Sequence, residues 1–368
     1  MMITLKWREL TKVLKLPQFG WKIIILTNSP FSRVYKLEHP SNSKFYFKTY
    51  DSNFTFRKED YIYRLFHDSE LLPTLIYSSN NSKEPFSSFI LIKDDDFIPI
   101  SIYVKKSNYQ HLKDYAFVIG NHLARFHLNS KNYSISQNVI PRKPFSTILK
   151  NEIKEFLSFV NLNKSFFYKN NQDAIDSIII PDFDTKCLEF HEILHSLVQR
   201  LKSTLVLIEK INFRNNDEFL IHGDFWRGNI LIKHHIIDKF EIKFIDFGNT
   251  HLGDRRIDFI RFFTRSFTVS PYYSLKDMRI KKPIWDNFLR GYKTITSLPD
   301  DLNVDIFYFI LYDLVFVINY YLDFRWERIF TSMKMKQEHF SRLFRQLICL
   351  YELISEDFCS EKYFYSLS

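Results

Sequence analysis

The sequence HGDFWRGN at residues 222–229, followed by IDFG at residues 245–248, decides the fold of this 368-residue chain. The chain contains only seven glycines, and four of them fall within the 31 residues from 223 to 253. A chain this poor in glycine keeps it mainly where the backbone needs a positive φ or a close approach to another group. These glycines bracket Asp224, Asn229 and Asp246, so the segment predicts a polar site built on tight backbone turns.

The three polar residues have the chemistry that phosphoryl transfer needs. Asp224 can orient or accept the proton of an attacking hydroxyl, whereas Asn229 and Asp246 offer the hard oxygen ligands that suit Mg²⁺. A hairpin expected between residues 229 and 245 would bring Asn229 and Asp246 to the same end of two paired strands. Kinases place one base and two Mg²⁺ ligands in this order. The agreement at His222, Asp224, Asn229, Asp246 and Gly248 together is too specific to arise by chance.

An upstream lysine and glutamate complete this interpretation. Lys48 lies in a strand expected over residues 44–50, and alternation points it away from the face that carries Phe45 and Phe47. A lysine on such a strand is usually solvated. Glu59, however, opens a helix expected over residues 56–66, and from there it could orient Lys48 against nucleotide phosphates as a kinase ion pair does.

The arrangement resembles the aminoglycoside phosphotransferase and choline kinase family, the small-molecule branch of the protein-kinase-like fold. The resemblance is best at residues 222–229 and 245–258, and it extends more weakly to Lys48, to Glu59 and to LARFH at residues 123–127. It implies an α+β, bilobal fold. Residues 1–98 would form an N-terminal nucleotide-binding lobe with an antiparallel sheet and one helix. Residues 99–368 would form a larger, mainly helical lobe with the catalytic loop at residues 222–258 and the acceptor-binding helices.

The family also assigns roles to the residues that match its motifs. Asp224 would be the catalytic Asp, Asn229 and Asp246 would hold Mg²⁺, and Lys48, positioned by Glu59, would bind the phosphates. His222 and Asp258 would brace the catalytic loop rather than touch substrate.

One segment departs from the family's pattern. The turn expected to cover the phosphates, residues 29–33, contains no glycine, although Ser29 and Ser32 supply extra donors there. This departure leaves both ATP and GTP open as the phosphoryl donor.

The motif favours a small-molecule acceptor over a protein. The core is His-Gly-Asp rather than the His-Arg-Asp of protein kinases, and Gly253-Asp254 leaves little room for an activation loop. We expect an ATP-dependent phosphotransferase acting on a hydroxyl of a sugar, an amino alcohol or a related molecule. An envelope glycan or an aminoglycoside is an alternative acceptor. Trp285-Asp286 and residues 319–326 could form a box for a choline-like ammonium, although a place in the core is favoured. A non-catalytic kinase-like binding module is the competing class.

The charge, the cysteines and the apolar stretches limit which classes of protein this chain can belong to. The net charge is +9, from 51 Lys and Arg against 42 Asp and Glu, but no basic run is long enough to predict nucleic-acid binding. Three cysteines without metal spacing, and the lack of a signal-peptide pattern, favour a cytoplasmic protein. Residues 306–322 are apolar but short for a membrane span and contain Asp313 and Asn319, so they predict a buried helix. Nothing in the sequence indicates an oligomeric state.

One other motif needs an explanation. Residues 191–195 read His-Glu-Ile-Leu-His, a pattern that binds zinc on one face of a helix. A third ligand is not evident, and the apolar stripe of the surrounding helix accounts for the pattern. We therefore interpret it as a structural helix rather than as a metalloprotease site.

Overall fold

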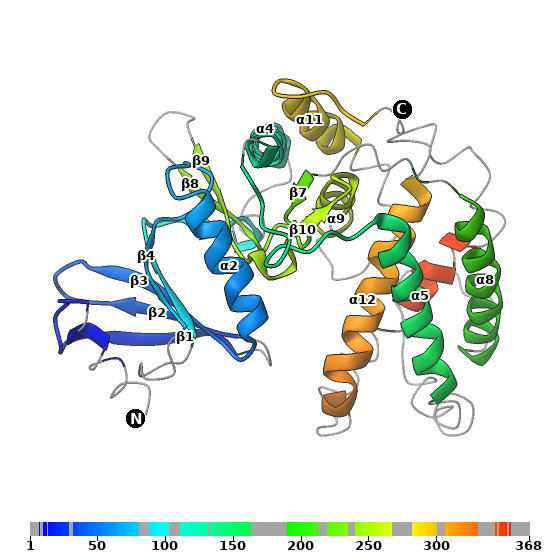
Figure 1. Ribbon diagram of the computed structural model, residues 1–368, viewed down its shortest axis with the longest axis horizontal. Helices are drawn as coiled ribbons and strands as arrows, with labels where there is room; N and C mark the ends of the chain where they lie inside the picture. The colour runs from blue at the N-terminus through cyan, green and yellow to red at the C-terminus, as the bar shows by residue number, and fades with distance from the viewer. Residues whose placement is uncertain are drawn as a thin grey trace. The chain divides into compact units, whose positions relative to one another are not determined.

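The computed structural model describes residues 7, 10–12, 14–28, 32–80, 88–102, 111–131, 133–162, 190–211, 213, 219–234, 240–266, 282–299, 306–329, 343, 346–351 and 353–354. The chain forms two compact units (Figure 1). Residues 1–142 and 220–252 make the first unit, and residues 143–219 and 253–368 make the second. The expected lobe boundary between residues 98 and 99 stays a prediction.

The first unit contains a five-stranded antiparallel sheet. Its order is β1 (Lys22–Asn28), β2 (Ser32–Glu38), β3 (Lys44–Tyr50), β5 (Phe89–Lys93) and β4 (Leu75–Ser79). The turn residues His-Pro-Ser-Asn-Ser at 39–43 predict a hairpin, and strands β2 and β3 form it, with Glu38 opposite Lys44 and Ser32 opposite Tyr50.

One face of this sheet is an apolar core. The cluster consists of Trp7, Leu10, Tyr35, Leu37, Phe47, Phe89 and Leu91. Because side chains alternate along a strand, Phe47 in the core places Lys48 on the opposite face of β3, as predicted.

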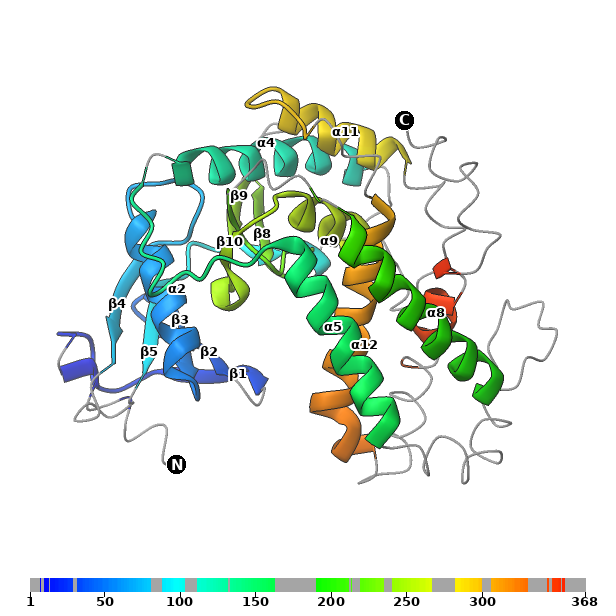
Figure 2. The same cartoon turned by 45° about the vertical axis from the view of Figure 1, so that its right-hand side comes forward.

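Helix α2 (Asn53–Leu65) differs in two ways from the helix expected over residues 56–66. It starts earlier because the Ser52 hydroxyl caps it by accepting a hydrogen bond from the Thr55 amide, 3.4 Å away. Glu59 therefore lies in the middle of the helix, not at its start. The buried face also differs: apolar spacing predicts Tyr61 on the same face as Ile62, whereas Tyr63 is buried and Tyr61 is only half-buried. Figure 2 shows α2 beside the sheet.

The rest of the first unit carries the glycine-rich segment. It contains helix α4 (His111–Lys131) and two short sheets. One pairs β7 (Phe219–Ile221) with β10 (His251–Gly253), and the other has the order β6 (Ile98–Pro99), β8 (Ile230–His234) and β9 (Phe240–Phe244). Strands β8 and β9 form the predicted hairpin, with Ile230 opposite Phe244. The short 3-10 helix η1 (Phe247–Asn249) begins three residues after the end of β9.

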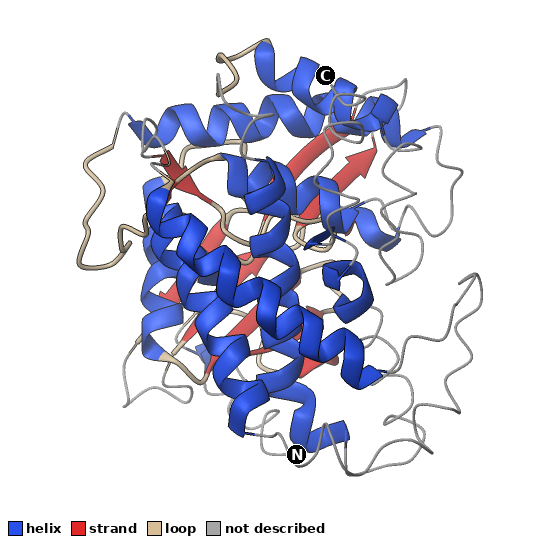
Figure 3. Cartoon of the chain, turned by 90° about the vertical axis from the view of Figure 1, so that its right-hand side faces the viewer, coloured by secondary structure: helices blue, strands red, loops and turns tan. Residues whose placement is uncertain are grey.

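The second unit is helical in its described residues. It contains α5 (Phe145–Leu162), α8 (Phe190–Lys210), α9 (Arg256–Ser266), α11 (Lys282–Lys293) and α12 (Ile306–Ile329), and α12 packs against both α5 and α9. The combination of helices and strands is visible in Figure 3 and confirms the predicted α+β class.

Helix α12 contains the apolar stretch at residues 306–322, which is a buried helix as predicted. Within the described parts of the chain, no helix has both the length and the apolar character that crossing a membrane requires.

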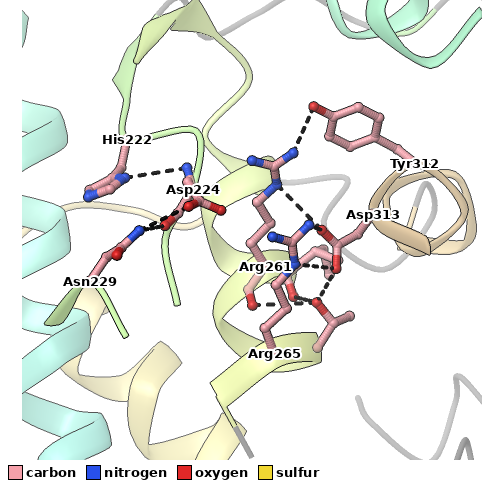
Figure 4. A network of polar contacts seen from close by, with 9 residues as sticks. His222, Asp224, Asn229, Arg261, Arg265, Tyr312 and Asp313 are labelled. Carbon is pink, nitrogen blue, oxygen red and sulfur yellow. Dashed lines mark hydrogen bonds and ion pairs between the residues drawn. The ribbon is translucent and has the colours of Figure 1, made fainter. Parts of the chain in front are cut away.

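The charge of Asp313, which is 1% exposed, is balanced from α9. Arg265 donates to Asp313, with its Nε 3.2 Å from Oδ2, and the Arg261 Nε lies 3.4 Å from Oδ1. Arg261 also donates to the Tyr312 hydroxyl at 3.0 Å (Figure 4). This cluster joins α9 to α12 through charge inside the helical unit.

Candidate active site

A buried lysine joins two carboxylates in the first unit. The Lys48 ammonium lies 2.8 Å from Glu59 Oε2 and 2.8 Å from Asp246 Oδ1. Lys48 is 8% exposed and Glu59 is 1% exposed, whereas the Asp246 side chain is 49% exposed. Strand β3, helix α2 and the turn between β9 and η1 thus supply one group each. The predicted Lys48–Glu59 pair forms, but Lys48 is buried rather than solvated.

The charges in this cluster shift one another's titration. Burial alone would lower the pKa of Lys48, but the carboxylates of Asp246 and Glu59 outweigh it and the pKa is raised. Burial, with the nearby negative charge of Asp246, raises the pKa of Glu59 against the opposing effect of Lys48. The Lys48 ammonium lowers the pKa of Asp246. Asp246 is therefore an ionised carboxylate that is open to solvent.

Two tyrosines that sequence reasoning missed line this cluster. The Lys48 ammonium lies 5.2 Å from the centre of the Tyr50 ring. Burial raises the pKa values of Tyr50 and Tyr63, and the Glu59 carboxylate adds to the effect. A signal for both was present, because Tyr50 is two residues after Lys48 on a strand and Tyr63 is four residues after Glu59 on a helix.

The loop at residues 222–229 is held by hydrogen bonds of its histidine. The Asp224 amide donates to His222 Nδ1 at 3.3 Å, so the other ring nitrogen, Nε2, carries the proton and donates to the Ile245 carbonyl at 3.0 Å. Gly223 has φ of 75°, and a Cβ there would lie 2.3 Å from the carbonyl oxygen of Asn249. Glycine is required at residue 223 for both reasons.

Asp224 and Asn229 contact each other across this loop (Figure 4). The Asn229 side-chain amide donates to the Asp224 carbonyl at 2.8 Å and to the Asp224 carboxylate at 3.0 Å. The Ile245 amide in turn donates to the Asn229 carbonyl at 3.1 Å, which joins the loop to the end of the β8–β9 hairpin. The hairpin thus places Asn229 beside Ile245, the residue before Asp246.

Asp246 has a left-handed backbone, with φ of 69° and ψ of 68°. Aspartate adopts this conformation more readily than most residues, but it remains sparsely populated. The next residue, Phe247, is buried and lies 4.9 Å from the His222 ring and 5.8 Å from the Tyr63 ring, measured between centroids. The packed Phe247 thus holds Asp246 at the edge of the cluster.

The remaining predicted site residues are on other elements or outside the described residues. Ser32 is the first residue of β2, while Ser29 falls outside the described residues. Asp258 is fully buried in the first turn of α9, in the helical unit, so its bracing role stays a prediction. Trp285 packs in the core against Phe263, with ring centroids 4.9 Å apart, and not in an open box.

The His-Glu-Ile-Leu-His motif lies on α8. His195 is exposed there, and the side chains of His191 and Glu192 are outside the described part. Among the residues that the structure describes, no three His, Cys, Asp or Glu side chains gather in a way that could hold a metal ion.

The antiparallel sheet with one helix, the buried Lys–Glu pair and the His-Gly-Asp loop together define the class of small-molecule kinases with a protein-kinase-like fold. The chain belongs to the ecdysteroid kinase-like family, whose model matches residues 102–293. The predicted enzyme class, a phosphotransferase with an alcohol group as acceptor, is confirmed by this membership. A search of curated protein sequences gives no match.

Solved structures of such kinases share the fold over nearly the whole chain. An amicoumacin kinase in complex with AMP-PNP is 15% identical, with 96% of each chain covered and a TM-score of 0.57. A spectinomycin phosphotransferase in complex with ADP and spectinomycin is 14% identical, with 95% of this chain and 98% of that chain covered and a TM-score of 0.59. An ethanolamine kinase from Plasmodium vivax is 16% identical, with 96% and 89% covered and a TM-score of 0.54.

Proposed function

We propose that this chain is an ATP-dependent phosphotransferase that phosphorylates a hydroxyl of a small molecule, with GTP as the alternative donor. The observation that carries the proposal is the contact of one buried ammonium, Lys48, with both Glu59 and Asp246, because the three come from separate elements. Membership of the ecdysteroid kinase-like family supports it independently.

Lys48 is the residue that would bind the phosphates of the donor. Its ammonium is already desolvated and is oriented by Glu59, so little reorganisation would accompany nucleotide binding. The raised pKa of Lys48 keeps it positively charged at neutral pH. Ser29 and Ser32 remain the proposed extra donors in the turn over the phosphates.

The donor set at the loop fits Mg²⁺. Asp246 is ionised and half exposed, and Asn229 supplies an amide oxygen, so both offer the hard oxygen ligands that this cation prefers. When bound, the cation would neutralise charge on the nucleotide phosphates. Asp246 and Asn229 are the residues that would hold it.

Asp224 is the proposed catalytic residue. Its carboxylate is partly exposed, and the Asn229 amide fixes its orientation. From this position Asp224 would accept or orient the proton of the acceptor hydroxyl. His222 acts by holding the Asp224 backbone and the Ile245 carbonyl in place.

The acceptor is proposed to be a sugar, an amino alcohol or a related alcohol. The named substrates of the similar structures, spectinomycin and ethanolamine, differ widely in size and charge and set the range for a screen. An aminoglycoside or an envelope glycan is tested in the same screen by mass spectrometry of the products.

The test is a thermal melt of the wild type and of Asp246→Asn, with and without Mg²⁺–ATP and Mg²⁺–GTP. A ligand that binds only the native state raises the melting temperature. We expect a Mg²⁺-dependent rise in the wild type that Asp246→Asn loses. The control variant, Asp286→Asn on the exposed face of α11, should show the same Mg²⁺-dependent rise as the wild type. A well-folded wild type that shows no rise with either nucleotide would instead favour a kinase-like binding module.

A further inference from the structure

Trp226 differs from the other tryptophans whose side chains the structure describes. The rings of Trp7 and Trp21 contact each other, and Trp285 contacts Phe288. Within the described part of the chain, no aromatic ring or cation contacts the half-buried Trp226 indole, and its N–H makes no hydrogen bond. Its indole face and N–H therefore have no partner of these kinds among the residues that the structure describes.

Gly228 explains how the Trp226 indole is held. A Cβ at residue 228 would lie 2.5 Å from Cζ2 and 2.7 Å from Cη2 of the Trp226 ring. Gly228 does not have a positive φ, so space rather than backbone conformation requires glycine here. The indole lies directly on the Gly228 backbone, and any side chain at residue 228 would push it away.

Along the chain, Trp226 lies between two residues of the proposed reaction centre. Trp226 is two residues after Asp224 and three before Asn229. The Asn229 amide donates to the Trp226 carbonyl at 2.8 Å, and the Ser101 amide donates to the Arg227 carbonyl at 3.2 Å. The Trp226 backbone is thus fixed in the loop that carries Asp224.

We propose that Trp226 is a specificity-determining residue that contacts the acceptor. This inference rests on the proposed phosphotransferase function. The indole offers an apolar face and one N–H donor at its edge. Its complement is an uncharged hydroxylated ring, such as a sugar or a sterol-like alcohol, which has a C–H face to stack on the indole and a hydroxyl oxygen to accept its hydrogen bond.

A small ammonium alcohol fits the indole less well. An ammonium would bind the indole face by cation–π attraction. The hydroxyl oxygen of such an alcohol can also accept from the indole N–H, but the molecule has no C–H ring face to stack on the indole, and the next residue along the loop, Arg227, is itself a cation. The chemistry of the loop therefore favours the ring alcohol.

The test compares Trp226→Ala, Trp226→Phe and Gly228→Ala with the control Trp21→Phe, which lies just before β1 and outside the loop. The probes are an ecdysteroid, glucose and ethanolamine. We expect Trp226→Ala to raise the KM for the ring alcohol by about tenfold, which corresponds to one lost aromatic contact. Its KM for ATP and its melting temperature should stay close to those of the wild type. Gly228→Ala should also raise the KM for the ring alcohol, because its methyl group displaces the indole. Trp226→Phe should raise this KM by a smaller factor.

Other results would overturn the proposal. If Trp226→Ala raises the KM for ATP as much as the KM for the acceptor, Trp226 has a structural role. If the enzyme phosphorylates ethanolamine, and Trp226→Ala does so at an unchanged rate, the ring-alcohol proposal is wrong although the kinase function holds.

A binding experiment covers the case in which the wild type responds to Mg²⁺–nucleotide but turns over no probe. Binding of the ring alcohol is then measured by indole fluorescence. Binding that weakens in Trp226→Ala supports the proposal, and no binding overturns it. A wild type without any Mg²⁺–nucleotide response contradicts the phosphotransferase function itself.

Discussion

Lys48 is the residue on which the charge balance of the site depends. Its ammonium is the direct partner of Glu59, which is almost completely buried, and of Asp246. Removing one partner of a buried ion pair costs more than the pair contributes, because the other charge stays buried without compensation. Glu59 can relieve this cost only by taking up a proton.

We therefore expect Lys48→Met to lower the free energy of unfolding by about 3–5 kcal/mol at neutral pH. The deficit should depend on pH. The pKa of Glu59 is already raised above 4.5, and loss of Lys48 raises it further. An acid with a raised folded-state pKa loses stability as pH rises from its unfolded value towards the folded one. The deficit should be small at pH 4.5 and grow above it, as measured by urea unfolding across this range.

Lys282→Met is the matched control. The Lys282 ammonium lies 3.8 Å from the Asp286 carboxylate, and both side chains are exposed. Exposed pairs of this kind contribute about 0.5 kcal/mol or less. A Lys48→Met deficit equally small and independent of pH would show that Glu59 does not depend on Lys48.

Two glycines with positive φ allow a second comparison at single residues. Gly20 has φ of 87° and Gly223 has φ of 75°. A methyl group at residue 20 would lie 3.1 Å from the His39 side chain, which can move, whereas one at residue 223 would collide with the Asn249 carbonyl. Gly20→Ala should cost about 1–2 kcal/mol, the usual penalty of the left-handed region.

Gly223→Ala should cost more and should also remove nucleotide-dependent stabilisation, because the loop that carries Asp224 must shift. Denaturant unfolding with and without Mg²⁺–ATP measures both effects. Equal costs at the two positions would mean that φ alone, and not the Asn249 contact, requires Gly223.

At the scale of elements, local patterns correctly predicted strand β3, the β8–β9 hairpin and the buried helix at residues 306–322. Strict alternation in β3 placed Lys48 opposite Phe47, and the turn residues at 39–43 predicted the β2–β3 hairpin. What the pattern could not give was the burial of Lys48. That burial depends on Asp246, which is 198 residues away along the chain, and on the exact rotation of α2.

The errors in α2 have a local cause. The helix starts at Asn53 because Ser52 caps it, and this signal was in the sequence. The buried face of α2 includes Glu59 and Tyr63, because the helix packs against the charged cluster of Lys48 and Asp246 as well as against apolar residues. An apolar-periodicity argument gives no weight to a buried glutamate, so it selected Tyr61 instead.

The sequence alone indicated which polar residues of the loop belong together, but not the contacts that hold the loop in place. The sequence indicated Asp224, Asn229 and Asp246 as one group. The contact of Gly223 with Asn249 and the stacking of Trp226 on Gly228 depend on atomic positions that no spacing encodes.

The joint between α9 and α12 gives a prediction for whole elements. Asp313 accepts hydrogen bonds from Thr264 and Arg265 and pairs with Arg261, which is 1% exposed. Asp313→Asn should lower the free energy of unfolding by about 3–5 kcal/mol, because two buried or nearly buried guanidinium groups lose their counter-charge.

Chemical denaturation compared with the exposed Asp286→Asn gives the measurement. Asp286 also carries a carboxylate on a helix of the same unit, but its side chain is 50% exposed. Its loss should change stability by no more than about 0.5 kcal/mol. Equal small effects of the two substitutions would mean that apolar packing alone holds α9 to α12.

For the molecule as a whole, the alkaline limit of stability follows from buried groups in both units. Burial raises the pKa values of Tyr50 and Tyr63 in the first unit, and it raises the pKa of Tyr312 in the helical unit to about 12. The pKa of Lys48 is raised as well. In each case the native state keeps a proton that the unfolded chain loses, so stability falls as pH rises above about 10.

Tyr312→Phe isolates one of these contributions. At neutral pH the variant should be about 1 kcal/mol less stable than the wild type, because the Arg261 guanidinium loses the hydroxyl that it contacts at 3.0 Å. Between pH 10 and pH 12 the wild type should lose about 3 kcal/mol through Tyr312, since a shift of two pKa units corresponds to that free energy.

The stability curves of the wild type and Tyr312→Phe should therefore cross within this interval, as followed by denaturant unfolding at a series of pH values. Tyr133→Phe, at an exposed tyrosine, should give a curve parallel to the wild type. Parallel curves for Tyr312→Phe would instead mean that the Tyr312 hydroxyl reaches solvent before the chain unfolds, and that the α9–α12 joint opens locally in alkali.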